Sequence, residues 1–279
     1  SSERRVKGAQ DVLVSSTRED HSVVEGSEVV VEEISATDPS SLSHYEDNLR
    51  EAGALPKLTS LLSAHRMALR VGQSITYPAV INGVISCINN MAMNQHNQKH
   101  LKDCIPALID FASTDKTDES VQLASLQALT NLSVNSEYHT PYTKLVQQLF
   151  EYLDHGGHSV KLQALKVLAN LSTNEQMVPH LLAAKAPACL LSLLSPDTET
   201  DLLIRWTTIL ANVIQTVKDR GLTATSLPHE YKAPSPETTY TALYGHVTLQ
   251  KLKSKVFVLC RHGNTDIRHQ ASRIHRCLT

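Results

Sequence analysis

A ten-residue string that recurs at nearly constant spacing constrains this chain more than any other feature. Residues 126–135 read LQALTNLSVN, and residues 165–174 read LKVLANLSTN, an offset of 39 residues. Weaker copies read ISCINNMAMN at 85–94 and ILANVIQ at 209–215. The asparagines that mark the four copies are 41, 39 and 42 residues apart: Asn90, Asn131, Asn170 and Asn212. Self-similarity at a fixed period predicts a repeat architecture, in which each unit packs on its neighbours.

A second marker recurs in register with the asparagines. Pro106 lies 25 residues before Asn131, and Pro187 lies 25 residues before Asn212. In the copy between them, Leu145 takes the same place before Asn170. Pro56 precedes its asparagine by 34 residues, so about nine extra residues are expected, as a loop within 65–77. Two markers in register over four copies indicate one repeating structural unit.

Each unit has the pattern of three helices. Apolar residues in 121–134 recur at helical spacing, and proline is tolerated in a helix's first turn. The unit is thus a short helix, a proline-started second helix and a longer third helix that carries the asparagine. The helix ends expected from local sequence are N-caps at Asp118 or Thr117 and at Asp197 or Thr198, and a left-handed C-cap at Gly156-Gly157.

A period of ~40–47 residues with two or three helices is typical of HEAT and armadillo arrays, and the proline favours armadillo. We therefore predict an all-α, armadillo-type α-solenoid, a right-handed superhelix of three-helix repeats. The predicted segments are a disordered acidic stretch at 1–37 and a helical domain at 38–279, with repeats around 40–95, 96–135, 136–175 and 176–218, a loop at 219–240 and a cap at 241–279. A strand at Val29–Val31 is a less favoured alternative, and two helices broken at Gly263-Asn264 are expected in the cap.

Charge and cysteine content limit the function classes. A net charge of −2 argues against a strongly basic protein wrapped on nucleic acid. Residues 1–60 hold twelve acidic and six basic side chains, whereas residues 247–279 hold seven basic and one acidic. The five cysteines form no CxxC pair, so we expect reduced, buried thiols in a cytosolic or nuclear compartment. The sequence shows no signal peptide and no apolar run long enough to span a bilayer.

The sequence contains no recognised catalytic motif and one weak candidate for a metal site. The phosphate-binding, nucleophile-elbow and zincin signatures are all missing from the sequence. His96, His100 and Cys104 are spaced i, i+4, i+8 and would share one face of a straight helix, as zinc ligands do. The favoured interpretation is a turn and short first helix with solvated histidines; His155 and His158 flank a Gly-Gly turn and are weaker candidates. We predict no enzyme, no cofactor and no metal.

The four marker asparagines are the strongest candidate for a functional site. Stacked units would place Asn90, Asn131, Asn170 and Asn212 in a ladder along the concave groove. They could brace neighbouring helices, because asparagine is unfavourable inside a helix unless its amide finds a partner. Equally, they could hold the backbone of an extended or helical protein partner. The tryptophans that importin-like receptors place one turn earlier are replaced here by Ser86, Gln127, Lys166 and Thr208.

The basic C-terminal end is the second candidate. Its residues are Lys251, Lys253, Lys255, Arg261 and Arg268. They could form a solvated face, a dock for an acidic partner, or a contact with anionic lipid headgroups. The first is favoured, because lysines at alternate positions of a helix do not share one side.

The strings at 126–135 and 165–174, with QLA before the first and VPHLL after the second, resemble the armadillo-like domain of the X-linked armadillo-repeat proteins. That family includes autosomal relatives and the GPCR-associated sorting proteins, and residues 252–262 and 266–278 are similar to its closing helices. The resemblance implies a protein-interaction scaffold at the cytosolic face of mitochondria that acts in mitochondrial positioning and dynamics. The family's membrane anchor would lie before Ser1. The alternative is a soluble cytosolic or nuclear adaptor for signalling or transcription factors.

Overall fold

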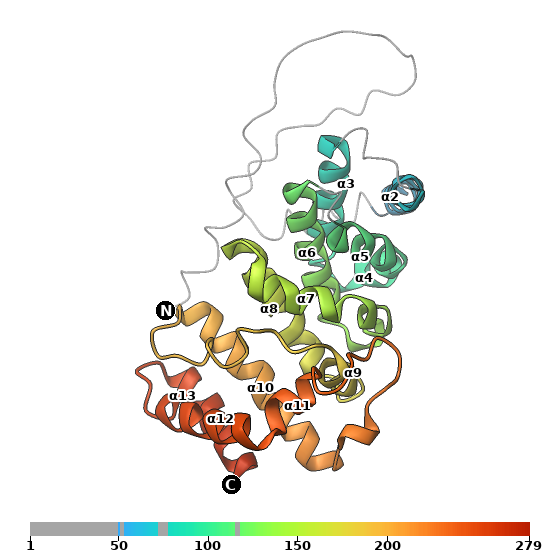
Figure 1. Ribbon diagram of the computed structural model, residues 1–279. Helices are drawn as coiled ribbons and strands as arrows, with labels where there is room; N and C mark the ends of the chain where they lie inside the picture. Colours follow the sequence, from blue (N-terminus) through green and yellow to red (C-terminus); the bar gives the residue numbers. More distant parts are fainter. Residues whose placement is uncertain (1–49, 51–52, 72–77, 115–117) are drawn as a thin grey trace, which may run out of the picture. The chain divides into compact units, whose positions relative to one another are not determined.

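The computed structural model describes residue 50 and residues 53–71, 78–114 and 118–279 (Figure 1). The chain divides into two compact units, Ser1–Pro39 and Ser40–Thr279. The first unit, with the predictions of disorder at 1–37 and of a strand at Val29–Val31, lies outside the described residues. The described part of the second unit contains helices and turns, and its one β-type pairing is an isolated bridge between Lys185 and Thr238.

The helices follow the predicted alternation of short and long elements. In chain order they are α2 (Ala54–Arg70), α3 (Pro78–Met91), α4 (Gln95–Leu101), η1 (Lys102–Cys104), α5 (Ile105–Ser113), α6 (Glu119–Leu132), η2 (Ser136–Tyr138), η3 (Thr140–Lys144), α7 (Val146–His155), α8 (His158–Ser172), α9 (Val178–Ala183), α10 (Thr200–Arg220), η4 (Ala224–Ser226), α11 (Thr239–Tyr244), α12 (His246–Leu259) and α13 (Thr265–Leu278).

The long helices that carry the marker asparagines stack directly on one another. Helix α3 packs on α6, α6 on α8, α8 on α10, and α10 on α13 (Figure 1). We call α3, α6, α8, α10 and α13 the third-helix row. A second layer covers the row from one side, because α5 packs on α6, α7 on α8 and α12 on α13. Successive units thus bury each other's apolar faces, and the prediction of an all-α solenoid is confirmed.

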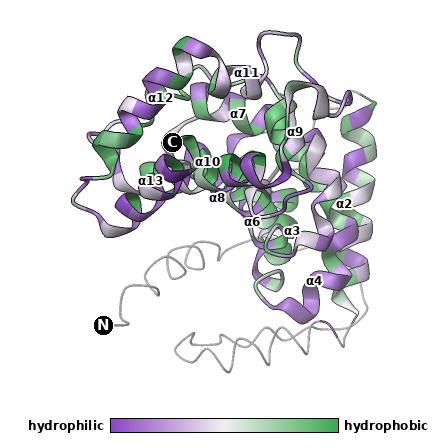
Figure 2. Ribbon diagram, turned by 90° about the horizontal axis from the view of Figure 1, so that it is seen from below, coloured by the Kyte–Doolittle hydropathy of each residue, from purple (hydrophilic) through white to green (hydrophobic). Residues whose placement is uncertain are grey.

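The core between the two layers is built from aliphatic side chains. Leu129 and Leu168, which hold equivalent places in the repeat, are both fully buried. Trp206 is the single tryptophan of the chain; it is also buried, and its indole N–H donates to the carbonyl of Leu190 at 2.9 Å. Figure 2 shows the hydrophobic residues alternating with hydrophilic ones along the helices, the pattern of a helix buried on one side.

The last asparagine of the repeated string starts the next repeat. The side-chain oxygens of Asn94, Asn135 and Asn174 accept the backbone N–H two residues later, at 2.9, 3.0 and 2.9 Å. Asn264 caps α13 in the same way, so the predicted break at Gly263-Asn264 is confirmed. Each capped turn satisfies a backbone N–H that the helix leaves without a partner.

Two of the three predicted helix ends differ from the structure, and one is confirmed. Asp118 caps α6 through the N–H of Ser120, as expected. Helix α10 instead begins after Glu199, without a side-chain cap, so the N-cap prediction at Asp197 or Thr198 is wrong. Gly156 and Gly157 are not left-handed, with φ of −68° and −62°. Gly156 is required for space, because a Cβ there would lie 2.7 Å from the carbonyl oxygen of Tyr152.

The fourth repeat lacks a regular second helix. Pro187 was expected to open one, but residues 188–193 form consecutive turns. The carboxylate of Asp154 accepts the N–H groups of Ala188 and Cys189 at 2.8 and 2.9 Å and so fixes the first turn. Leu190 and Leu194 still fill the core at the place of a second helix. Burial of these side chains is therefore kept although helical hydrogen bonding is lost.

The ends of the array also differ from expectation. Helix α2 runs on to Arg70, so part of the insertion expected as a loop within 65–77 is helical. The C-terminal unit has three helices, α11 to α13, where two were expected. The loop expected at 219–240 is held to the chain after α9 by bonds from the N–H groups of Ala233 and Thr239 to the carbonyls of Ala183 and Ala184. All five cysteines are free, but Cys104 alone is buried and Cys87 is exposed.

Candidate interaction surface

Hydrogen bonds donated by side chains join neighbouring helices of the third-helix row. The Nδ2 of Asn170 on α8 donates to the carbonyl of Thr130 at 3.2 Å and to Oγ of Ser133 at 2.9 Å. The Nδ2 of Asn131 on α6 makes the equivalent pair of bonds with Asn89 on α3, to its carbonyl at 3.2 Å and its Oδ1 at 2.9 Å. Both marker amides therefore brace the preceding repeat.

The last marker continues this pattern to the end of the row. The Nδ2 of Asn212 on α10 donates to Oγ of Ser172 at 3.0 Å. Its Oδ1 accepts from the guanidinium of Arg273 on α13 at 3.2 Å. A further bond joins Thr130 to Gln163 at 3.2 Å. We call these cross-repeat hydrogen bonds the polar seam.

Asn90, the first marker, differs from the other three. It is exposed, and its side chain forms no hydrogen bond with any described residue. Asn131 and Asn170 are half-buried. No described residue donates a hydrogen bond to their Oδ1 atoms, and neither of these atoms is shielded from solvent. The bracing interpretation is thus observed at three markers, and these two acceptors still face solvent.

Charge is unevenly spread over the free face of the row. On α3 and α6 the residues near the markers are uncharged, including Gly83, Cys87 and Gln127. Helix α8 carries Lys166 one turn before its asparagine, and α10 carries Arg205. Burial, followed by the positive charge of Arg205, lowers the pKa of the Lys166 ammonium, and the carboxylate of Asp201 opposes this shift in part.

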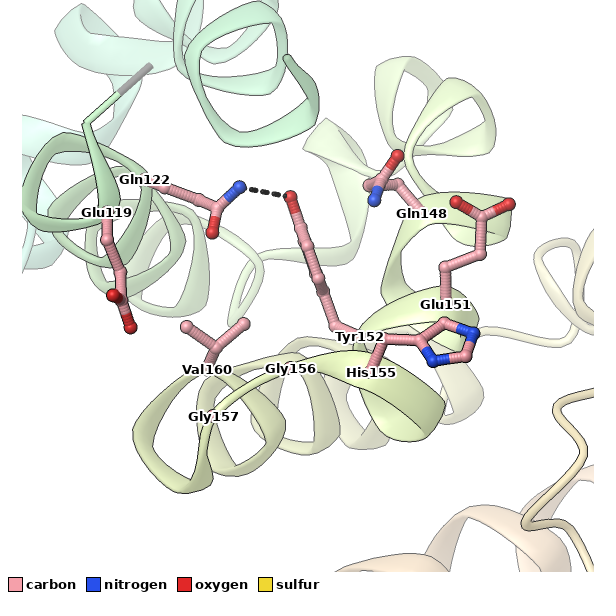
Figure 3. A pocket seen from close by; sticks show the side chains of 9 residues that line it. All are labelled: Glu119, Gln122, Gln148, Glu151, Tyr152, His155, Gly156, Gly157 and Val160. Atoms are coloured by element: carbon pink, nitrogen blue, oxygen red, sulfur yellow. Dashed lines mark hydrogen bonds between the residues drawn. The ribbon is translucent and has the colours of Figure 1, made fainter. Parts of the chain in front are cut away.

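A hollow of ≈ 560 Å³ lies where α6, α7 and α8 meet (Figure 3). Tyr152 forms one wall; its hydroxyl donates to the carbonyl of Ala112 and accepts from Nε2 of Gln122 at 2.7 Å. Glu119 and Glu151 stand at the rim, and His155 lies beside Glu151. The tyrosine hydroxyl is fully used in structural bonds, so nothing in this hollow resembles an activated nucleophile.

The five residues of the expected basic cap do not form one charged face. Arg268 donates to the carbonyls of His262 and Gly263, both at 2.8 Å, and so holds the turn between α12 and α13. Arg261 stacks over the ring of Phe257 at 4.8 Å. Lys255 contacts the carbonyl of Leu194 at 3.4 Å, and Lys253 is half-buried, whereas Lys251 is exposed.

The candidate metal ligands do not face one point. His96 and His100 are exposed on α4, whereas Cys104 is buried after the helix has ended at Leu101, and its Sγ lies 3.2 Å from Oγ1 of Thr59. The short first helix with solvated histidines is therefore what the structure shows. Within the described ranges no group of three or more His, Cys, Asp or Glu side chains is placed to hold a metal ion.

Two comparisons with known proteins bear on this arrangement. The profile of a family described as Armadillo-like matches residues 49–231, about two thirds of the chain. The chain belongs to the Armadillo-like family. The matched region of this armadillo-like protein contains α3, α6, α8 and α10, and thus all four marker asparagines.

Solved structures of designed armadillo repeat proteins are similar to the armadillo-like protein in fold. One, in complex with the peptide (KR)4, is 19% identical over 84% of this chain and 85% of its own, with a TM-score of 0.57. Another, computationally designed for modular peptide recognition, is 19% identical over 84% and 86%, with a TM-score of 0.59. A third is 17% identical over 88% and 96%, with a TM-score of 0.60. Among the described residues, no helix is both long and apolar enough to cross a membrane.

Two features of the surface were not predicted from the sequence. The capping role of Asn94, Asn135 and Asn174 had a local signal, since each follows its marker by four residues and precedes a new helix. The effect of Arg205 on the pKa of Lys166 had no such signal, because it depends on the packing of α8 on α10.

Proposed function

We propose that this chain is a non-enzymatic scaffold that binds a partner polypeptide along the third-helix row. The carrying observation is the row itself, in which five stacked helices leave one continuous face without a covering layer among the described elements. The polar seam keeps these helices in register, so exposed side chains recur at a regular interval. A regular surface of this kind suits an extended segment, whose own residues also recur at a constant spacing.

Available hydrogen-bonding groups support this proposal. The Oδ1 atoms of Asn131 and Asn170 and the exposed amide of Asn90 lie along the row. An extended partner has backbone N–H groups in need of acceptors. The buried polar side chains Ser125, Thr207 and Gln98, in contrast, bond to backbone carbonyls within the protein. The peptide complex of one designed relative in fold is compatible with this mode.

The location of the scaffold is a further part of the proposal. Similarity to the X-linked armadillo-repeat and GPCR-associated sorting proteins supports a place at the cytosolic face of mitochondria and a role in mitochondrial dynamics. A soluble cytosolic or nuclear adaptor is the alternative. Fractionation of the full-length protein separates the two, because a purely nuclear pool would overturn the mitochondrial version.

The proposed binding surface can be tested directly by introducing positive charge in the middle of the row. Gln127 lies on α6 and Val134 lies two residues after its end. Val134 is exposed, and Gln127 is half-buried without a hydrogen bond to a described residue. We expect Gln127→Arg/Val134→Arg to lose partners that the parent recovers by proximity labelling in cells. Ser63→Arg on the exposed side of α2 is the matched control and should lose none. A folded row variant with an unchanged partner list would reject the row as the binding surface.

A further inference from the structure

Helix α12, which lies beside α11 and α13 in the C-terminal unit (Figure 1), carries a stripe of side chains that stand clear of the core. They recur at the three- and four-residue spacing of one helix face: Val247, Lys251, Ser254, Phe257, Val258 and, in the turn after the helix, Arg261. We call these six residues the outer stripe. Because α12 belongs to the layer that covers the third-helix row, the outer stripe is a surface separate from the row.

Half of the outer stripe is apolar and exposed. The exposed fraction of the residue is 66% for Val247, 48% for Phe257 and 53% for Val258. The other two phenylalanines of the chain, Phe111 and Phe150, are buried in the core. Apolar surface gathered on one helix face is unfavourable in water, and contact with a partner would remove that cost.

The exposed ring of Phe257 is held by two neighbours. The guanidinium carbon of Arg261 lies 4.8 Å from the centre of the ring. On the adjacent helix α13, the imidazole of His275 meets the ring edge-to-face, with 6.0 Å between ring centres. A side chain that is already positioned loses little conformational freedom when a partner binds. Aromatic and arginine side chains also carry much of the binding energy at protein interfaces.

A hollow of ≈ 430 Å³ opens beside this ring. Its walls are Pro196, Phe257, Val258, Arg261, His262 and Gly263. The guanidinium of Arg268 donates to the carbonyls of His262 and Gly263, both at 2.8 Å, so the turn that forms one wall is fixed from behind. The volume is ample for a bulky aliphatic side chain, and the exposed ring supplies an apolar wall for it.

The charge around the hollow is positive. Helix α12 contains no acidic residue, and residues 247–279 hold seven basic side chains and one acidic. Lys251 and Arg261 are exposed, and neither forms an ion pair with a carboxylate of the described residues. Asp197 and Asp266 lie near the lining residues in sequence, but both are exposed and neither pairs with Arg261. A segment that enters the hollow therefore gains from carrying negative charge.

We propose that the outer stripe docks an acidic amphipathic helix of a partner protein, with one leucine-like side chain in the hollow beside Phe257. Carboxylates of that helix pair with Arg261 and with Lys251, which lie roughly 15 Å apart along the helix direction. A helix packed along α12 presents acidic side chains at such intervals, whereas its apolar stripe faces Val247 and Val258. This second surface goes beyond the proposed binding along the row.

An anionic membrane fits the same features less well. Lys255 contacts the carbonyl of Leu194 at 3.4 Å and Lys253 is half-buried, so only Lys251 and Arg261 remain as cations of the outer stripe. Segments that bind anionic lipid carry clusters of about four to eight basic residues. A recess that takes a single side chain is also not matched by a flat lipid surface. The features therefore point to a protein segment.

The test uses three fluorescein-labelled peptides of about 14 residues, long enough to form a helix on the protein. The first repeats leucine at helical spacing with glutamate at the flanking places. The second has lysine for each glutamate, and the third has serine for each leucine. Fluorescence anisotropy with the full chain should show binding of the first peptide, weakened by added salt, and at least about tenfold weaker binding of the other two.

Variants of the chain locate the binding. Phe257→Ala/Arg261→Gln should weaken binding of the first peptide about tenfold. The matched control Met67→Ala/Lys57→Gln removes one exposed apolar side chain and one exposed cation from α2, and should change the affinity less than about twofold. All four positions are exposed, so circular dichroism should show both variants as helical as the parent.

Failure of the first peptide to bind, or equal loss of affinity in the two double variants, would overturn the docking site. Chain that binds phosphatidylserine-containing vesicles through Phe257 and Arg261, but binds no peptide, would assign the outer stripe to lipid and also overturn it. The row variant Gln127→Arg/Val134→Arg should keep the peptide affinity of the parent. If that variant alone loses the peptide, the peptide binds the row, and the docking site is rejected while the scaffold function stands.

Discussion

The side-chain amide of Asn170 donates to the hydroxyl of Ser133 at 2.9 Å, and the same contact is made one repeat later between Asn212 and Ser172 at 3.0 Å. In both cases the asparagine of one repeat is joined to the serine two residues after the preceding marker. The stability of a solenoid is approximately the sum of its units and of the interfaces between them. The polar seam belongs to the interfaces, so its loss should weaken the coupling between repeats.

The seam can be measured by comparing two asparagines at the same repeat position. Asn170→Ala removes two cross-repeat hydrogen bonds and leaves the Thr130 carbonyl and the Ser133 hydroxyl without this donor, at an expected cost of about 1–2 kcal/mol. Asn90→Ala makes the same chemical change at an exposed amide without such bonds and should stay within about 0.5 kcal/mol of the parent. Urea unfolding followed by fluorescence of Trp206, the only tryptophan, gives both values.

A double-mutant cycle shows whether the loss comes from the contact itself. With Ser133→Ala as the second change, we expect a coupling energy of about 0.5–1.5 kcal/mol between positions 170 and 133. Strictly additive effects would show that the asparagine stabilises the helix by some other means.

Substitutions in the aliphatic core should lower the free energy of unfolding more than substitutions in the polar seam. Leu129→Ala and Leu168→Ala each empty a fully buried site between stacked helices and should cost about 2–5 kcal/mol. Leu61→Ala on α2, where the side chain is 38% exposed, is the control and should cost clearly less. Comparable losses at all three positions in urea unfolding would contradict the assigned burial.

Asp154 should make stability depend on acid. Burial alone would raise the pKa of this carboxyl, but hydrogen bonds from the N–H groups of Ala188 and Cys189 hold the pKa below its ordinary value of 3.8. A lowered folded-state pKa means that the stabilisation is complete above 3.8 and is lost as pH falls through the lowered value. Urea midpoints of Asp154→Asn should fall less than those of the parent as pH is lowered from about 6 to about 3.

The control for this carboxylate is an acidic residue in the connection between α9 and α10. Asp197→Asn removes an exposed carboxylate, and the acid-induced fall of the parent should persist in that variant. If the urea midpoint of Asp154→Asn falls with acid as much as that of the parent, the carboxylate that anchors the turn at 188–193 is not the titrating group.

His139 should give a pH dependence at milder acidity. The ring is buried, its Nε2 lies 2.7 Å from the carbonyl of Ser133, and its Nδ1 lies 3.3 Å from the amide nitrogen of Asn174. Burial lowers the pKa of the imidazole below 6.5, and the bond to Ser133 opposes this in part. The folded state therefore favours the neutral ring, and its contribution is complete above 6.5 and lost as pH falls through the lowered pKa.

NMR titration of the imidazole protons measures this pKa directly. The loss of stability between about pH 8 and about pH 5 should be reduced in His139→Gln and retained in His96→Gln, whose histidine is exposed. A pKa for His139 at or above 6.5 would contradict its assigned environment.

The failure of the helix prediction after Pro187 has a tertiary cause. Asp118, with Thr117 as the alternative, could be predicted as a cap from the local sequence, because the N–H group that it accepts belongs to Ser120, two residues away. The turns after Pro187 were missed, since they depend on Asp154, 34 residues from Ala188. The close approach at Gly156, in contrast, is to the carbonyl of Tyr152, only four residues earlier in the chain. Helix propensity at Pro187 was overridden by a contact that no local pattern contains.

By itself the sequence determined the period, the helical phase of each unit and hence the stacked all-α architecture, because burial of an apolar stripe depends on spacing along the chain. The sequence also identified the four marker asparagines as candidate functional residues. Only the tertiary structure decided what these amides do: three of them donate hydrogen bonds to the preceding repeat, and Asn90 is left exposed. The physical reason is that a hydrogen bond or a charge pair depends on distances of a few ångströms between residues about forty positions apart, which stacking sets and periodicity does not.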